Sequence, residues 1–200
     1  KTISLIAESL KVEHAIELIE TQSGRAMLAY AHRLQVLAGT SGVKAVKNLV
    51  QDPDFKAARL LAETCLENNI EHPKINVLKQ IVSEQISKKK DCKIIIFNQY
   101  RDQAEQILSE LKSIGVDACL FFGQMKKNNT GMSQKQQQQA IADFRAGAFP
   151  CLIATSVAEE GLDIPQVDLV LFYEPVPSAI RTVQRRGRTG RQEQGKVAVL

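Results

Sequence analysis

The chain has 200 residues, of which 44% are hydrophobic and 24% are charged, and its formal net charge at pH 7 is +4. This length and hydrophobic content are enough for one large domain or two small ones with buried cores. No stretch approaches the roughly 18–20 consecutive apolar residues of a membrane-spanning helix. The net charge is too small to indicate a nucleic-acid partner by itself.

The four cysteines and three histidines are scattered singly along the chain, and no pair has a metal-binding spacing. This pattern favours buried, reduced thiols over disulfides and predicts no metal site. The chain also starts without the charged-then-apolar layout of a signal peptide. We therefore expect a cytoplasmic protein of an archaeon or bacterium, or a nuclear one in a eukaryote, with no membrane partner.

Residues 1–72 are predicted to form an all-helical domain, because their apolar residues recur at helical spacing with almost no strand-like alternation. Three helix-start signals fall inside this block: Ser23, Ser41 and Asp52, the last followed by a proline at the first helical position. Pro73 disfavours helix in the residue before it, so a domain boundary is predicted between 72 and 73.

Residues 73–200 alternate between amphipathic helices and short apolar runs. The predicted helices are 74–87, 102–114, 134–146 and 178–186, and the predicted strands are 94–97, 118–122, 151–154, 169–173 and 197–200. Short apolar strands between helices are typical of a buried parallel sheet in an α/β fold. Ser133 and Gln136 form a capping-box pattern, so the glutamine run after them is predicted to be helix surface.

An arginine-rich segment lies near the end of the chain, where residues 180–196 carry six basic side chains and only one acidic one. Arg188 and Arg191 are three residues apart, and Gly187 frees the backbone before them. Two guanidinium groups so placed could converge on one phosphate chain, since arginine is permanently charged and donates in a planar fork. A run of charge is more often a solvated surface, so its context must decide.

That context is a fixed order of three segments, FRAG at 144–147, ATSVAEEGLDIP at 154–165 and QRRGRTGR at 184–191. The order resembles that of motifs V and VI of superfamily 2 helicases. Residues 154–191, including YEPVPSAIR, resemble the archaeal Hef helicases and their Fanconi anaemia group M relatives. IIIFNQYRDQAEQIL resembles their motif IV, and AIELIETQSGRAMLAY resembles the insert between their two motor domains. The resemblance covers essentially the whole chain.

This resemblance implies a RecA-like parallel sheet flanked by helices over residues 73–200, preceded by an all-helical insert over residues 1–72. It also implies ATP with Mg²⁺ as the cofactor. Arg188 and Arg191 would be arginine fingers for the γ-phosphate, with Gln184 near the phosphate or the attacking water. Gly161 and Asp163 would serve the nucleotide and the coupling between domains. Asp163 could also be a plain turn residue before Pro165, and Gln184 an exposed helix side chain.

For DNA, the resemblance points to the loops that follow the predicted strands, because ligands of open parallel sheets bind beyond the carboxyl ends of the strands. The candidates for contacts with the phosphate backbone are Thr155, Ser156, Asn98, Tyr100, Arg101, Gly123 and Arg145. Contacts of this kind hold a strand without reading its sequence. Tyr100 could equally be a packing residue.

Half of an ATPase site is missing from this sequence, which contains neither a G-x-x-x-x-G-K-[ST] phosphate loop nor a DExH-type carboxylate motif. The resemblance implies that a first RecA-like domain of the same polypeptide supplies both. We therefore expect residues 1–200 alone to hydrolyse no ATP at a meaningful rate.

The expected function is that of an ATP-dependent DNA helicase or translocase acting on forked or branched DNA in the repair of stalled forks. One alternative is a duplex-RNA helicase of the Dicer and innate-sensor type, which also carries a helical insert. Gly190-Arg191 and YEPVPSAIR favour the DNA group. The other is a non-catalytic module that docks nucleic acid or protein.

Overall fold

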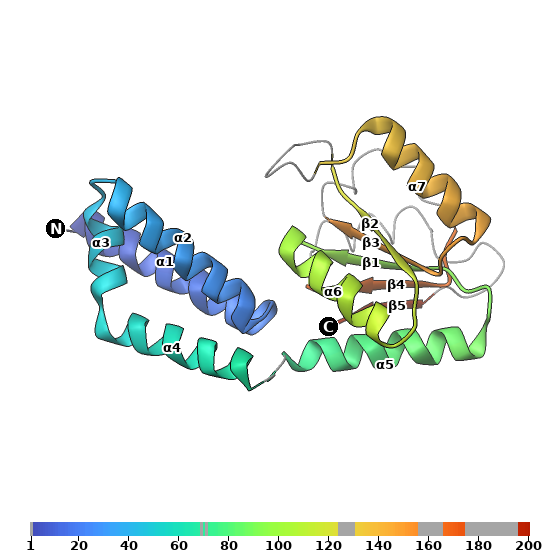
Figure 1. Cartoon of the computed structure of the whole chain (residues 1–200), viewed down its shortest axis with the longest axis horizontal. Coiled ribbons are helices and arrows are strands. Elements are labelled where there is room, and N and C mark those ends of the chain that lie inside the picture. Colours follow the sequence, from blue (N-terminus) through green and yellow to red (C-terminus); the bar gives the residue numbers. More distant parts are fainter. Residues whose placement is uncertain (1, 69, 71, 124–130, 156–165, 175–195) are drawn as a thin grey trace. The chain divides into compact units, whose positions relative to one another are not determined.

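The computed structural model describes residues 2–68, 70, 72–123, 131–155, 166–174 and 196–200. The chain divides into two compact units, Lys1–His72 and Pro73–Leu200. The first is helical and the second contains a parallel sheet with helices (Figure 1). The predicted fold class is therefore confirmed. No helix among the described residues is long and apolar enough to cross a membrane.

The helical unit consists of α1 (Thr2–Thr21), α2 (Gly24–Thr40), α3 (Lys44–Gln51) and α4 (Pro53–Glu67). Two of the predicted start signals are confirmed. The Ser23 side chain accepts a hydrogen bond from the Ala26 backbone N–H at 3.2 Å, and Asp52 accepts from the first N–H groups of α4. Both side chains satisfy backbone donors that have no partner inside the helix.

The third start signal, Ser41, was a wrong prediction, because this residue ends α2 instead of starting α3. Its backbone N–H donates to the Leu37 carbonyl at 2.8 Å. Gly39 does not break α2, since one glycine in a helix costs only about 1 kcal/mol relative to alanine. The next helix begins at Lys44, and Val43 before it makes no side-chain cap.

In the described part of the second unit, the sheet has five parallel strands in the order β2-β3-β1-β4-β5. These strands are β1 (Ile94–Asn98), β2 (Ala118–Phe121), β3 (Cys151–Thr155), β4 (Leu169–Phe172) and β5 (Lys196–Val199). Every residue of the three central strands is buried, as expected for a sheet covered on both faces.

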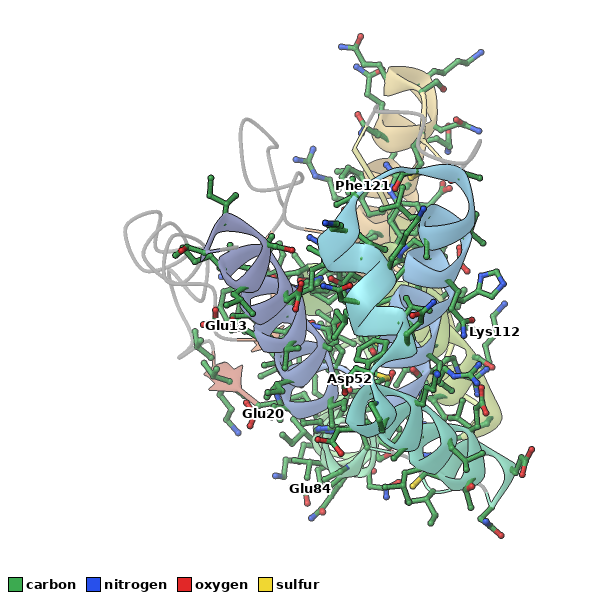
Figure 2. The ribbon with its side chains drawn as sticks, turned by 90° about the vertical axis from the view of Figure 1, so that its left-hand side faces the viewer. Glu13, Glu20, Asp52, Glu84, Lys112 and Phe121 are labelled. Carbon is green, nitrogen blue, oxygen red and sulfur yellow. The ribbon has the colours of Figure 1, made fainter. Side chains whose placement is uncertain are left out.

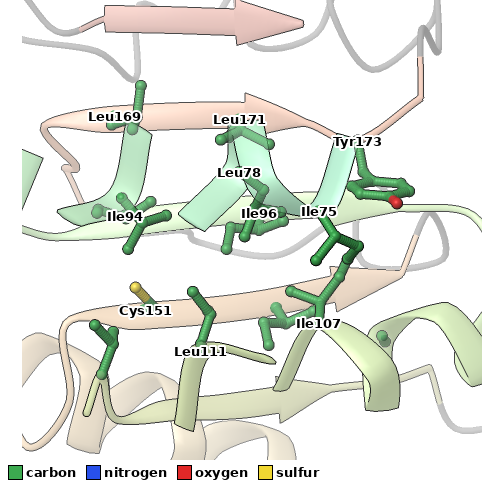
Figure 3. Packing of buried hydrophobic residues seen from close by; sticks show 14 of the residues in the cluster. Ile75, Leu78, Ile94, Ile96, Ile107, Leu111, Cys151, Leu169, Leu171 and Tyr173 are labelled. Carbon is green, nitrogen blue, oxygen red and sulfur yellow. The ribbon is translucent and has the colours of Figure 1, made fainter. Parts of the chain in front are cut away.

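Alternate residues of each strand point to opposite faces of the sheet, so the unit has two apolar layers. Helices α5 (Pro73–Lys88) and α6 (Arg101–Ser113) cover the first face. Figure 3 shows Ile75 and Leu78 of α5 and Ile107 of α6 packed against strand residues such as Ile96. On the other face, α7 (Gln134–Ala146) packs Phe144 against residues from the same strands.

The capping box at the start of α7 is confirmed. Ser133 accepts a hydrogen bond from the Gln136 N–H, and the Gln136 side chain accepts from the Ser133 N–H at 2.8 Å. Gly147 ends the helix at φ 80°, a left-handed conformation that glycine adopts without strain. The glutamine run is therefore part of a helix, as predicted.

The four cysteines are free thiols, of which Cys92 and Cys151 are buried and Cys65 and Cys119 are half-buried. Burial raises the pKa of the Cys151 thiol to about 12, with a further contribution from Cys92. A thiol held protonated in this way is neither a nucleophile nor a metal ligand. Its role is to fill the core beside Ile94, its partner in the neighbouring strand.

Candidate functional site at the carboxyl edge of the sheet

The carboxyl ends of four strands meet at one edge of the sheet. In the parallel register Asn98 lies opposite Thr155, and Phe121 lies opposite Ala154. Beyond the last paired residues, the Tyr173 N–H donates to the Phe97 carbonyl at 2.8 Å. The loops after β1, β2, β3 and β4 therefore all start at this edge, which is where ligands of open α/β sheets bind.

Buried polar side chains gather at the same edge. Among the described residues of the α/β unit, the buried polar or charged residues are Asn98, Gln103, Thr155 and Glu174, with exposed fractions of 1%, 2%, 4% and 3%. Two of them end strands, one lies just beyond β4, and one lies in the first turn of α6. Since buried polar groups destabilise a fold unless they are paired, this concentration points to a function.

Some of these buried atoms have no hydrogen-bond partner within the described part of the chain. They are the side-chain oxygen of Asn98 and both polar atoms of the Gln103 amide. An unpaired buried polar group costs about 1–3 kcal/mol. Such destabilising groups are kept in a site when a ligand or another segment needs their atoms as hydrogen-bond partners.

The segment between β1 and α6 is shaped by its own side chains. Asn98 donates through its amide nitrogen to the Tyr100 carbonyl. The Arg101 guanidinium lies 5.3 Å from the centre of the Phe122 ring, at the end of β2. Gly123 follows this phenylalanine directly. Five predicted candidates, Asn98, Tyr100, Arg101, Gly123 and Thr155, are thus brought to one edge by three strands.

Arg145, also predicted to contact the nucleic-acid backbone, is at the opposite edge. It lies in the last turn of α7. Its backbone carbonyl accepts a hydrogen bond from Lys93 Nζ at 2.6 Å, and Lys93 immediately precedes the first residue of β1. The helix after β2 runs back antiparallel to the strands and so returns the chain to their amino ends. The structure therefore does not bring Arg145 together with the other candidates.

Three polar residues of this region were missed by the sequence analysis. Gln103 had a readable signal, because it shares the buried face of α6 with apolar Ala104, Ile107 and Leu111. Glu174 directly follows the predicted strand 169–173, the kind of position from which other candidates were taken, whereas Lys74 had no such signal. They are 100 positions apart in the sequence, and only the sheet order brings the end of β4 beside the start of α5.

The remaining predicted site residues lie outside the described residues. They are Ser156, Gly161, Asp163, Gln184, Arg188 and Arg191, and the predicted helix 178–186 lies there as well. Their roles stay predictions. Within the described ranges, no group of three or more histidine, cysteine, aspartate or glutamate residues could hold a metal ion.

The helical unit has a groove of about 820 Å³ between α1, α3 and α4. Apolar side chains such as Leu5 and Phe55 line it, and its charged lining residues are all acidic: Glu8, Glu13, Asp52 and Asp54. Figure 2 shows Glu13 on α1 and Asp52 at the start of α4. Negative charge repels phosphate, so this groove does not resemble a nucleic-acid site.

Two family models match this chain. The model of the "Helicase conserved C-terminal domain" matches residues 73–193, and that of the "Putative ATP-dependent RNA helicase, helical bundle" matches residues 2–69. The chain therefore belongs to the helicase conserved C-terminal domain family, within superfamily 2, and its helical unit matches the helical-bundle model.

Individual relatives agree with this assignment. The chain is 42% identical over 198 residues to "Putative ATP-dependent RNA helicase MJ1505" of Methanocaldococcus jannaschii, covering 99% of this chain and 24% of that protein. It is 40% identical over 172 residues to "ATP-dependent DNA helicase MPH1" of Pyricularia oryzae, covering 81% of this chain and 15% of that protein. It thus spans a quarter or less of these two relatives.

Among solved structures, the chain resembles the Hef helicase domain of Pyrococcus furiosus. The two are 46% identical with a TM-score of 0.77, and the match covers 97% of this chain and 39% of that one. The suspected resemblance to the group of Hef and Fanconi anaemia group M helicases is confirmed.

Proposed function

We propose that this chain is the second RecA-like motor domain, with its helical insert, of an ATP-dependent DNA helicase or translocase that acts on forked or branched DNA in repair. Arg188, Arg191 and Gln184 would face the γ-phosphate of ATP, and Gly161 and Asp163 would couple the nucleotide to the other domain. A first RecA-like domain of the same polypeptide would hold most of the ATP and Mg²⁺. The protein would work in the cytoplasm, or in the nucleus of a eukaryote.

One observation carries this proposal: among the described residues of the α/β unit, the buried polar side chains all lie at the carboxyl edge of the sheet, and two of them have atoms without a partner in that part of the chain. Asn98, Tyr100, Arg101, Gly123 and Thr155 would hold the backbone of a DNA strand there, with Ser156 next to them. Contacts to phosphate and sugar are indifferent to base sequence, which a motor that moves along DNA requires.

The proposal separates two kinds of residue at this edge, and mutation of the arginines tests that separation. In the longer protein that contains this chain, we expect Arg188→Ala or Arg191→Ala to lower DNA-stimulated ATP turnover by roughly 10³-fold, the usual scale for an arginine finger. DNA binding, measured by fluorescence anisotropy, should stay within about threefold, since phosphate contacts elsewhere remain. Equal loss of both would move these arginines to the DNA site.

Duplex RNA is the second candidate substrate, because the matching helical bundle and the Methanocaldococcus jannaschii relative carry RNA helicase in their names. The names of the Pyricularia oryzae relative and of two Schizosaccharomyces pombe relatives specify DNA. We expect forked DNA to stimulate ATP hydrolysis by the longer protein more than duplex RNA of equal length. Clearly stronger stimulation by RNA would replace the DNA proposal.

A further inference from the structure

A buried carboxylate ties together two loops of the carboxyl edge. Glu174 lies just beyond β4 and is 3% exposed. Its Oε2 accepts a hydrogen bond from the backbone N–H of Gln99 at 3.0 Å. Gln99 belongs to the segment between β1 and α6, so this bond joins that segment to the end of β4. It lies one residue beyond the last backbone hydrogen bond between β4 and β1, which runs from the Tyr173 N–H to the Phe97 carbonyl.

Lys74 supplies positive charge next to this carboxylate. It lies in the first turn of α5, and its Nζ donates to the Tyr173 carbonyl at 3.2 Å and lies 5.6 Å from the centre of the Tyr173 ring. Burial lowers the pKa of Lys74, and the attraction of Glu174 opposes that change. A carboxylate in such a place destabilises the fold unless an opposite charge and hydrogen bonds compensate it.

The two residues therefore connect three segments: the start of α5, the end of β4 and the loop after β1. Figure 3 shows Tyr173, the residue between them, beside Ile75 of α5 in the apolar core. Because Tyr173 is packed in this core, the backbone that Lys74 contacts and that leads into Glu174 is held in place. What these two residues hold in place is the 98–101 segment, whose Asn98 and Arg101 side chains carry the proposed contacts with the nucleic-acid backbone.

We propose that Lys74 and Glu174 are positioning residues that hold the Asn98–Arg101 segment in the geometry required to grip the backbone of a nucleic-acid strand. This inference rests on the proposed function of the carboxyl edge. Neither residue needs to touch the nucleic acid. Glu174 fixes the backbone of the segment through Gln99. Lys74 places a positive charge near Glu174 and holds the end of β4 through the Tyr173 carbonyl.

The test uses the longer protein that contains this chain and measures ATP hydrolysis as single-stranded oligodeoxythymidine is titrated. We expect Glu174→Ala to raise the half-saturating oligonucleotide concentration by about tenfold, because it removes the charged hydrogen bond to Gln99. Lys74→Met should raise it by about threefold, because it removes only the positive charge beside Glu174. The kcat at saturating oligonucleotide should stay within about twofold, because the nucleotide residues are unchanged. Lys74→Arg should restore the wild-type value.

The matched control is Lys79→Met. Lys79 is on the same helix and pairs with a half-buried carboxylate, Glu110, at 2.6 Å, but it is not among the residues of the carboxyl edge. It should leave the half-saturating concentration unchanged. A merely structural role for Lys74 would lower kcat and thermal stability together without moving that concentration.

The inference is overturned if Glu174→Ala and Lys74→Met keep the wild-type half-saturating concentration, or if Lys79→Met shifts it equally. If Glu174→Ala fails to fold, the comparison of Lys74→Met with Lys74→Arg still tests the inference. The failure of the proposed function would look different, because the wild-type protein would then show no stimulation of ATP hydrolysis by nucleic acid.

Discussion

At the amino edge of the sheet, charged side chains are paired with one another and with the backbone. At the carboxyl edge, some buried polar atoms have no partner among the described residues. Asp168, at the amino edge, accepts hydrogen bonds from Lys89 Nζ and from the Lys93 N–H, both at 2.8 Å. At the other edge, Asn98 and Gln103 are buried with unpaired atoms among the described residues. The described residues satisfy the charged groups of the amino edge, but they leave some buried polar groups of the carboxyl edge unpaired.

This difference teaches that burial and hydrogen bonding, more than charge, distinguish polar groups that stabilise the fold from polar groups that are available to a ligand. The lysines near Asp168 have their hydrogen-bond partners inside the protein. At the carboxyl edge, the unpaired polar atoms of Asn98 and Gln103 among the described residues are the ones left to meet a ligand or another segment.

The largest effect on stability is expected at the amino edge, from Asp168→Asn. Burial alone would raise the pKa of Asp168, but hydrogen bonds from Lys89 and from the Lys93 backbone, together with their charge, hold it below the ordinary value of 3.8. We expect the variant to lose about 1–2 kcal/mol of unfolding free energy at pH 7, the scale of a charged hydrogen bond discounted for the half-exposed Lys89.

A lowered pKa in the folded state also fixes how this loss depends on pH. The stabilisation is fully present above the carboxyl value of the unfolded chain and is lost as the pH falls through the lower folded value. Urea denaturation at pH 7 and pH 3 should therefore show the two proteins converging in acid. Glu84→Gln, which breaks a more exposed pair with Lys88, is the control and should cost less than about 0.5 kcal/mol. An equal loss of unfolding free energy at both pH values would contradict the ionic explanation.

At the carboxyl edge the expected effect on stability has the opposite sign. Gln103→Leu replaces two unpaired buried atoms by an apolar side chain of similar size, on a helix face already occupied by Ala104 and Ile107. We expect the unfolding free energy to rise by about 1 kcal/mol, while nucleic-acid-stimulated ATP hydrolysis of the longer protein falls. Urea denaturation and the ATPase assay check the two parts. A loss of stability would mean that Gln103 already has a partner.

The smallest effect is expected for Arg145→Ala. Its side chain is exposed at the amino edge, away from the other candidates. Stability should change by less than about 0.5 kcal/mol, and the half-saturating nucleic-acid concentration by less than about twofold, whereas Arg101→Ala should raise that concentration severalfold. Equal effects of the two substitutions would contradict the division between the edges.

The fold could be predicted from the sequence largely because its signals are local. Ser133 with Gln136, Asp52 with Pro53 and the short apolar strands each specify an element through neighbouring residues. Ser41 misled because a helix end and a helix start both favour small polar residues. The bond between Glu174 and Gln99 could not be foreseen, since it depends on β4 lying next to β1 across 75 residues of sequence.

The most direct test of the division between the edges is to map where a nucleic acid binds, using ¹⁵N-labelled residues 1–200 titrated with single-stranded oligodeoxythymidine. We expect the largest chemical-shift changes in the backbone amides of residues 98–101 and Thr155 and in the side-chain amides of Asn98 and Gln103. The amide chemical shifts of Lys89, Lys93 and Arg145 should hardly change. Shifts confined to those three residues, with an unchanged carboxyl edge, would contradict the assignment of the nucleic-acid site.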